Sequence, residues 1–139
     1  MVSANSESYR GKRVIVVEDD IPSAKYYETM LRKTGASVKL FRNGREFVSH
    51  IEKEGDIDAD IVIMDYLIPV INGVDCTRIS RKYSKSVPVI MISAFVSEEI
   101  KREAYIAGCN EYILKPLFPE NFLLVLEKYL LQRSPAYTR

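Results

Sequence analysis

The sequence predicts an α/β protein with a single doubly wound sheet of five parallel strands. Four short apolar runs, rich in β-branched or bulky residues, predict buried strands at residues 14–17, 61–64, 89–92 and 112–114. Segments with helical spacing separate the strands along the chain. Because helical segments between strands favour right-handed crossovers and a parallel sheet, we expect helices on both faces of the sheet.

Residues 37–41 predict the remaining strand, in which apolar and polar side chains alternate. Lys39 lies between Val38 and Leu40, a pattern typical of a strand with one side in water. We therefore expect this strand at an edge of the sheet.

The helices are predicted from apolar residues at i, i+3 and i+4 and from residues that start or stop a helix. The first follows Pro22, which suits a first turn, and ends before Gly35. Ser97, followed by two glutamates, suits the start of a helix over residues 97–107. The others are predicted around Phe47, His50 and Ile51, over residues 74–81, and from Pro119 through Leu130.

Composition limits the classes of partner. Lys and Arg number 20 against 19 Asp and Glu, so no net field attracts nucleic acid or an anionic membrane. No apolar run approaches the roughly 18 residues of a membrane span. We expect a cytoplasmic protein with an ordered domain over residues 12–131 and loose tails over residues 1–11 and 132–139.

The cysteines and the histidine predict no metal or relay chemistry. Cys76 and Cys109 lie far apart and lack nearby Cys or His partners, so we expect free, half-buried thiols in a reducing compartment. His50 falls on a predicted helix away from the acidic residues and is interpreted as structural. A solvated face is predicted for the cations Arg78, Arg81, Lys82 and Lys85.

Polar and charged side chains follow the predicted strands at the point where each strand ends. Ligands of an open parallel sheet gather at the carboxyl ends of its strands, so we expect these side chains at one rim. In chain order they are Glu18, Asp19, Asp20, Asp65, Ser93 and Lys115. Alone, the acidic cluster is more typical of a solvated turn, and Lys115 indicates little. Asp65 is as consistent with a cap, and Ser93 with a structural hydroxyl, as with a function. The combination favours a functional site.

The rim residues favour phosphoryl chemistry with a magnesium ion. Glu18, Asp19 and Asp65 offer the oxygen ligands that Mg²⁺ prefers, and such crowded carboxylates would tend to protonate without a cation. An ionised Asp65 can act as a nucleophile on a phosphoryl group once a metal ion shields the two anions from each other. Lys115 would pair with one phosphoryl oxygen, and the Ser93 hydroxyl would donate to another.

Together these motifs resemble those of the response-regulator receiver family, over residues 12–131. Val-Val-Glu-Asp-Asp, which contains Glu18 and Asp19, resembles the acidic pair of that family, and Ile-Met-Asp, which ends at Asp65, resembles its phosphoacceptor strand. The Pro and Gly of residues 68–73 resemble the loop after that strand. Within this loop the residues that depart from the commonest ones, without removing a ligand, are Ile68, Ile71 and Asn72.

Three later positions also match the receiver family. Ser93 resembles its switch hydroxyl, and Tyr112 resembles its rotating aromatic residue. Lys115 and Pro116 resemble its cis peptide, which costs little before proline.

The resemblance implies the flavodoxin-like strand order 2-1-3-4-5 and a signalling switch rather than an enzyme that acts on other molecules. Asp65 would accept a phosphoryl group from a histidine of a sensor kinase or phosphotransfer domain. Mg²⁺ would be held by Glu18, Asp19, Asp65 and the main-chain carbonyl of Leu67. An output face around the fourth helix, fifth strand and fifth helix would bind a downstream protein or an attached output domain. The resemblance allows a homodimer but does not require one.

The residues disfavour two alternative functions. A magnesium-dependent phosphohydrolase would carry an acid two residues after its nucleophile, where this chain has Leu67. A docking module that has lost its chemistry is disfavoured because the acids, Ser93 and Lys115 are all present.

Leu67 and Phe95 predict the lifetime of the modified state. They lie two residues after Asp65 and Ser93 and should border the approach of water to a phosphorylated Asp65. Neither side chain can orient a water molecule and both can block its path, so we expect slow hydrolysis.

Overall fold

The computed structural model describes residues 8–131, which form five parallel strands in one sheet. The strands are β1 (Arg13–Val17), β2 (Ser37–Phe41), β3 (Ile61–Asp65), β4 (Val89–Ser93) and β5 (Glu111–Leu114). Their order is β2-β1-β3-β4-β5, which confirms the predicted order.

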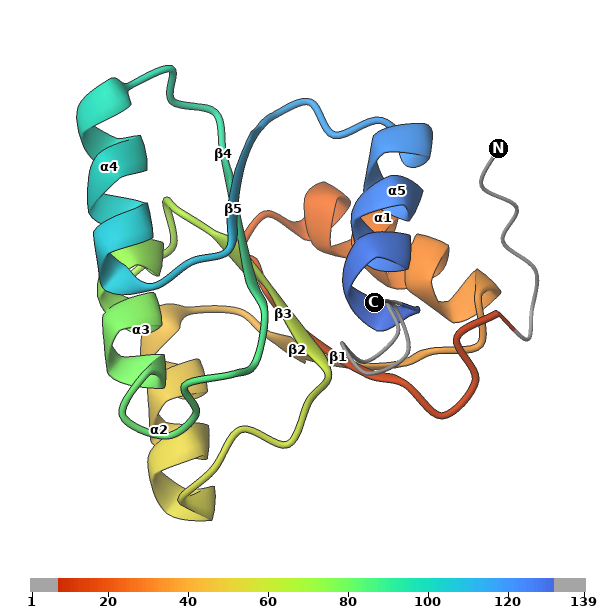
Figure 1. The fold of residues 1–139 in the computed structure, drawn as a ribbon, viewed down its shortest axis with the longest axis horizontal. Coiled ribbons are helices and arrows are strands. Elements are labelled where there is room, and N and C mark those ends of the chain that lie inside the picture. The colour runs from red at the N-terminus through yellow and green to blue at the C-terminus, as the bar shows by residue number, and fades with distance from the viewer. Residues whose placement is uncertain (1–7, 132–139) are drawn as a thin grey trace, which may run out of the picture.

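Helices alternate with the strands along the chain. They are α1 (Ile21–Lys33), α2 (Gly44–Glu54), α3 (Gly73–Ser80), α4 (Glu98–Ala107) and α5 (Pro119–Leu130). Figure 1 shows α1 and α5 on one side of the sheet and α2, α3 and α4 on the other, so the doubly wound architecture is confirmed. No helix among the described residues has the length and apolar character needed to cross a membrane.

Polar side chains fix where helices α1 to α4 begin. Asp20, Asn43, Asn72 and Ser97 each accept a hydrogen bond from the main-chain N–H three residues ahead. Such a cap stabilises a helix by about 1 kcal/mol, and the cap predicted at Ser97 is confirmed. The loops that precede these helices are therefore held at the end of the sheet where the strands finish.

Burial of the strands follows their place in the sheet. Every residue of the central strands β3 and β4 is buried. β2 forms one edge, as predicted, and Lys39 is exposed there. The strand predicted at residues 112–114 is present as β5, but its predicted burial is wrong. β5 forms the other edge of the described sheet, and Leu114 is 43% exposed.

Tyr9 corrects the expected start of the ordered domain. Residues 1–11 were expected to form a loose tail, but the Tyr9 side chain is buried in an apolar cluster that includes Leu31 and Leu130. Its main-chain N–H donates to Thr34 O (2.8 Å), which ties this segment to the end of α1. The rest of that tail, residues 1–7, and the tail expected over residues 132–139 lie outside the described residues.

Both thiols are free but buried, not half-buried as expected. They belong to the apolar cluster on the side of the sheet that α2, α3 and α4 cover. Burial raises the pKa of Cys76 to about 12 and that of Cys109 to about 11, so neither forms a reactive thiolate at neutral pH.

Arg81 does not belong to a solvated face, contrary to the prediction. Its guanidinium donates to the carbonyls of Ser84, Val87 and Gly108 at 3.1, 2.8 and 2.7 Å, and so links the end of α3 to the end of α4. A Cβ at Gly108 would lie 2.8 Å from the Arg81 side chain, and the φ of Gly108 is 115°. The positive φ favours glycine at this helix end, and a larger residue would also displace the Arg81 side chain.

Candidate functional site

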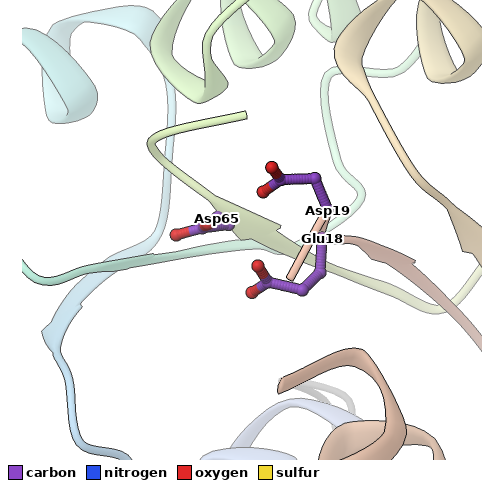
Figure 2. A group of neighbouring side chains, drawn as sticks. All are labelled: Glu18, Asp19 and Asp65. Carbon is purple, nitrogen blue, oxygen red and sulfur yellow. The ribbon is translucent and has the colours of Figure 1, made fainter. Parts of the chain in front are cut away.

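Three carboxylates meet where β1 and β3 end (Figure 2). Val17 of β1 pairs with Met64 of β3, so the residues that follow them, Glu18 and Asp65, lie side by side. Asp19 completes the group, in which one oxygen of each carboxylate lies within 4.8 Å of the others. The three side chains turn toward the same side of the strand ends, as Figure 2 shows. The expected convergence of these acids is thus observed.

Lys115 brings a positive charge to the acids. Its main-chain N–H donates to Ser93 O (2.8 Å), which places the end of β5 beside the end of β4. Its Nζ lies 3.3 Å from Asp65 Oδ1 and 3.5 Å from Glu18 Oε1. The peptide bond to Pro116 is cis, as the resemblance implies.

Burial and crowding oppose ionisation of the two buried acids. Burial, and next the Asp65 carboxylate, raises the pKa of Glu18 to about 7, although Lys115 acts in the opposite direction. Burial also raises the pKa of Asp65, again against Lys115. Burial lowers the pKa of Lys115, but the two carboxylates outweigh it and leave that pKa raised. One ammonium group therefore does not fully offset the negative charge, and a bound cation would relieve the excess.

The acids open into a cavity of about 400 Å³. Its apolar lining consists of Leu67, Ile68, Pro69, Ala94 and Phe95. Asp20 also borders the cavity, but its carboxylate accepts hydrogen bonds from the N–H and hydroxyl of Ser23 at 3.1 and 2.6 Å. These bonds lower the pKa of Asp20, so its main role is to cap α1.

Ser93 and Tyr112 meet at the main chain of Phe95. The buried Ser93 Oγ accepts a hydrogen bond from Phe95 N–H (2.9 Å), and the Tyr112 hydroxyl donates to Phe95 O (2.9 Å). The sequence singled out all three residues but not this link between them.

Leu67 and Phe95 lie at the mouth of the cavity, where 62% and 41% of their surfaces are exposed. The Phe95 ring packs edge-on against Tyr66, with ring centroids 5.6 Å apart. The position two residues after Asp65, where a phosphohydrolase carries its general acid, is occupied by Leu67, which cannot donate a proton.

Arg42 also contacts the site and was missed in the sequence. Its Nη2 donates to Asp19 O (3.0 Å). The two residues lie 23 positions apart, and no local spacing pattern connects them.

The sequence profile described as "Response regulator receiver domain" matches residues 14–127, which include every residue of the rim. The chain belongs to this receiver domain family. Receiver domains are modules of two-component signalling, and the strand order agrees with this membership.

Relatives of this receiver domain include regulators and kinases. Chemotaxis protein CheY of Thermotoga maritima is 33% identical over 119 residues, which cover 85% of this chain and 97% of CheY. Hybrid signal transduction histidine kinase M of Dictyostelium discoideum is 31% identical, over 87% of this chain and 5% of the kinase. Transcription factor SKN7 of Saccharomyces cerevisiae is 29% identical, over 91% of this chain and 20% of that protein. The chain thus spans only a small part of the latter two relatives.

Solved receiver domains superimpose on this one. The receiver domain of sensor histidine kinase PA1611 from Pseudomonas aeruginosa PAO1 has a TM-score of 0.77 at 27% identity, over 88% of this chain and 99% of that one. It was crystallised with a magnesium ion coordinated in the active site cleft. Chemotaxis protein CheY4 of Vibrio cholerae has a TM-score of 0.76 at 28% identity, over 86% and 98%.

Proposed function

We propose that Asp65 accepts a phosphoryl group from a phosphohistidine of a sensor kinase or phosphotransfer domain, with Mg²⁺ bound beside it. The observation that carries the proposal is the meeting of Glu18, Asp19 and Asp65 within 4.8 Å, with Lys115 Nζ 3.3 Å from Asp65. These groups border a cavity that a phosphodonor can enter.

The donor set fits magnesium. Glu18, Asp19 and Asp65 offer carboxylate oxygens, the main-chain carbonyl of Leu67 would add another, and Mg²⁺ takes oxygen ligands while it keeps several waters. A cation here would also lower the raised pKa values of Glu18 and Asp65, so that metal binding and ionisation favour each other. The magnesium ion in the PA1611 receiver domain supports the same choice. When bound, Mg²⁺ would shield the negative charges of nucleophile and phosphoryl group from each other.

In the proposed transfer, an Asp65 carboxylate oxygen forms a bond to phosphorus while the P–N bond of the donor histidine breaks. The electron pair of that bond stays on the donor imidazole nitrogen. Lys115 Nζ, already within 3.3 Å of Asp65, would pair with a phosphoryl oxygen. No side chain needs to remove a proton from Asp65, because the ionised carboxylate is the nucleophile.

The switch would start at Ser93. Its hydroxyl would turn from Phe95 N–H to a phosphoryl oxygen, and Phe95 O would carry the change to Tyr112. Tyr112 belongs to β5, the edge strand beside α4. The change would therefore reach the surface formed by α4, β5 and α5.

This surface is the proposed output face. It carries exposed apolar side chains, which a partner protein could cover. They are Ile106, Leu114 and Leu124. The partner would be a downstream protein, an attached output domain or a second copy of the chain.

Intact mass measurement tests the proposed acceptor. The protein is incubated with MgCl₂ and acetyl phosphate, and a gain of one phosphoryl group is expected. The gain should be absent in Asp65→Asn and in the presence of EDTA. The control is Asp58→Asn, which removes an exposed acid that pairs with Arg13 and should be phosphorylated like the unchanged protein.

The alternative is a docking module that keeps the fold without the chemistry. No mass gain with acetyl phosphate or with a phosphohistidine-containing domain would support that alternative and reject the proposal. A gain that persists in Asp65→Asn would reject Asp65 as the acceptor.

A further inference from the structure

The connection from the last residue of β2 to the first residue of α2, residues 41–44, contacts the loop that carries the acidic pair. Phe41 O accepts a hydrogen bond from Glu18 N–H (3.0 Å). The next residue, Arg42, donates from its Nη2 to Asp19 O (3.0 Å). Two successive residues of this connection thus hold the main chain of two successive acids.

The same connection also contacts the loop that follows Asp65. Gly44 N–H donates to Pro69 O (3.1 Å). A Cβ at Gly44 would lie 2.1 Å from Ile71 O, so the two backbones are in direct contact. Residues 41–44 therefore join the two loops that supply the carboxylates.

The start of α2 holds Arg42 in place. The Glu46 carboxylate accepts a hydrogen bond from Arg42 N–H (3.2 Å), and Glu46 N–H donates to the Asn43 side chain (2.8 Å). This arrangement is a variant of the capping box, in which the helix start and the residues before it fix each other. The side chain of Arg42 therefore extends toward Asp19 from an ordered main chain.

We propose that residues 41–44 form a brace that sets the spacing of the two acid-bearing loops, with Arg42 as the positioning residue for Asp19. The proposal rests on the proposed function, because it assigns the brace a role in magnesium binding. Charge and position have opposite effects here. A guanidinium near a cation site weakens cation binding by repulsion, whereas an ordered Asp19 strengthens it.

Calorimetric titration with MgCl₂ separates these effects. Arg42→Met removes both the charge and the hydrogen bond, and we expect the Kd for Mg²⁺ to rise on the order of tenfold, at the low end for an outer partner of a metal ligand. Arg42→Lys keeps a charge and one donor and should recover part of the affinity. The matched control is Arg45→Met, which removes the same charge from an exposed neighbour and should leave the Kd unchanged or slightly lower. An Arg42→Met protein that binds Mg²⁺ as tightly as Arg45→Met, which loses the same charge, would overturn the brace.

Amide hydrogen exchange in EDTA gives a readout that needs no metal. Peptides covering residues 17–23 should exchange faster in Arg42→Met than in Arg45→Met or the unchanged protein. Equal exchange in all three would reject the brace, whatever the metal does. If the unchanged protein fails to bind Mg²⁺, the proposed function fails, and the exchange data still decide whether the brace exists.

Gly44→Ala tests the other end of the brace. The added methyl group would displace Ile71 O, so exchange should rise over residues 66–72 and the Kd for Mg²⁺ should rise as well. Unchanged exchange in this loop would contradict the proposed contact. If Gly44→Ala does not fold, the Arg42 variants decide the question.

Discussion

Lys115 Nζ lies 3.3 Å from Asp65 Oδ1 and 3.5 Å from Glu18 Oε1, so one ammonium group serves two buried carboxylates. Burial raises the pKa values of both acids despite this partner. Their ionised forms are therefore held at a cost in stability when no cation is bound. The proposed binding of a divalent cation and a phosphoryl group would offset this cost.

Asp65→Asn should stabilise the metal-free protein. The neutral amide removes the repulsion with Glu18 and leaves Lys115 to pair with Glu18, so we expect the free energy of unfolding in EDTA to rise by about 1 kcal/mol. Saturating MgCl₂ should stabilise the unchanged protein more than the variant. Urea denaturation with and without magnesium measures both effects. A variant less stable than the unchanged protein in EDTA would contradict this account.

Magnesium binding should tighten between pH 6 and pH 8. Glu18 has a pKa of about 7 without metal, so at pH 6 a proton competes with the cation, and at pH 8 it does not. Titration calorimetry at both pH values measures the change in Kd, and Glu18→Gln should reduce it. A Kd that does not vary with pH would show that Glu18 is already ionised at pH 6.

The raised pKa of Glu18 also predicts how the stability of the metal-free protein changes with pH. The pKa of Glu18 is raised from 4.5 to about 7 in the folded protein, so the folded state binds more protons than the unfolded state in this range. The stability that this group contributes is complete below pH 4.5 and is lost as the pH rises through about 7. The difference in unfolding free energy between the unchanged protein and Glu18→Gln, measured in EDTA across this range, should show this trend.

Val70→Gly should stabilise the protein. Within residues 8–131, Val70 is the one residue other than glycine with a positive φ, at 76°, and it is 72% exposed. The left-handed conformation destabilises a β-branched residue by about 1–2 kcal/mol. Glycine removes this strain, but its greater loss of chain entropy on folding costs about 0.5–1 kcal/mol. We expect a net gain of about 0.5–1 kcal/mol in urea denaturation.

The control for this change is Val96→Gly. Val96 is also exposed, at 86%, but its φ is not positive, so glycine should only lower stability there. If both variants lose stability equally, Val70 is not strained.

Leu67→Asn combined with Phe95→Glu should speed loss of the phosphoryl group from Asp65. Polar side chains at the mouth of the cavity could orient the attacking water, and we expect an increase on the order of tenfold. Decay is followed by intact mass after removal of the donor. Leu67→Val with Phe95→Leu keeps the mouth apolar and should retain slow decay. Unchanged or slower decay in the polar double variant would reject the role of these residues.

Local patterns were enough to predict the strands, the starts of α1, α4 and α5, and the members of the rim. The continuous apolar run of residues 61–64 predicts a buried strand, and Ser97 before two glutamates predicts a capped helix, because each signal depends on neighbours in the chain. The rim followed from one rule of parallel sheets, since the ends of the strands bring Glu18, Asp65 and Lys115 to one edge.

Burial and long-range hydrogen bonds were decided only by the tertiary structure. β5 resembles a central strand in sequence but lies at an edge, and Tyr9 is buried by residues of α1 and α5. Arg42 reaches Asp19, and Arg81 reaches Gly108, across 23 and 27 positions. The amino-acid sequence by itself determined which chemical groups could lie at the rim, because residue type and the apolar pattern of a strand are local properties. Which of them do meet, and how much water remains around them, depends on the packing of segments distant in sequence.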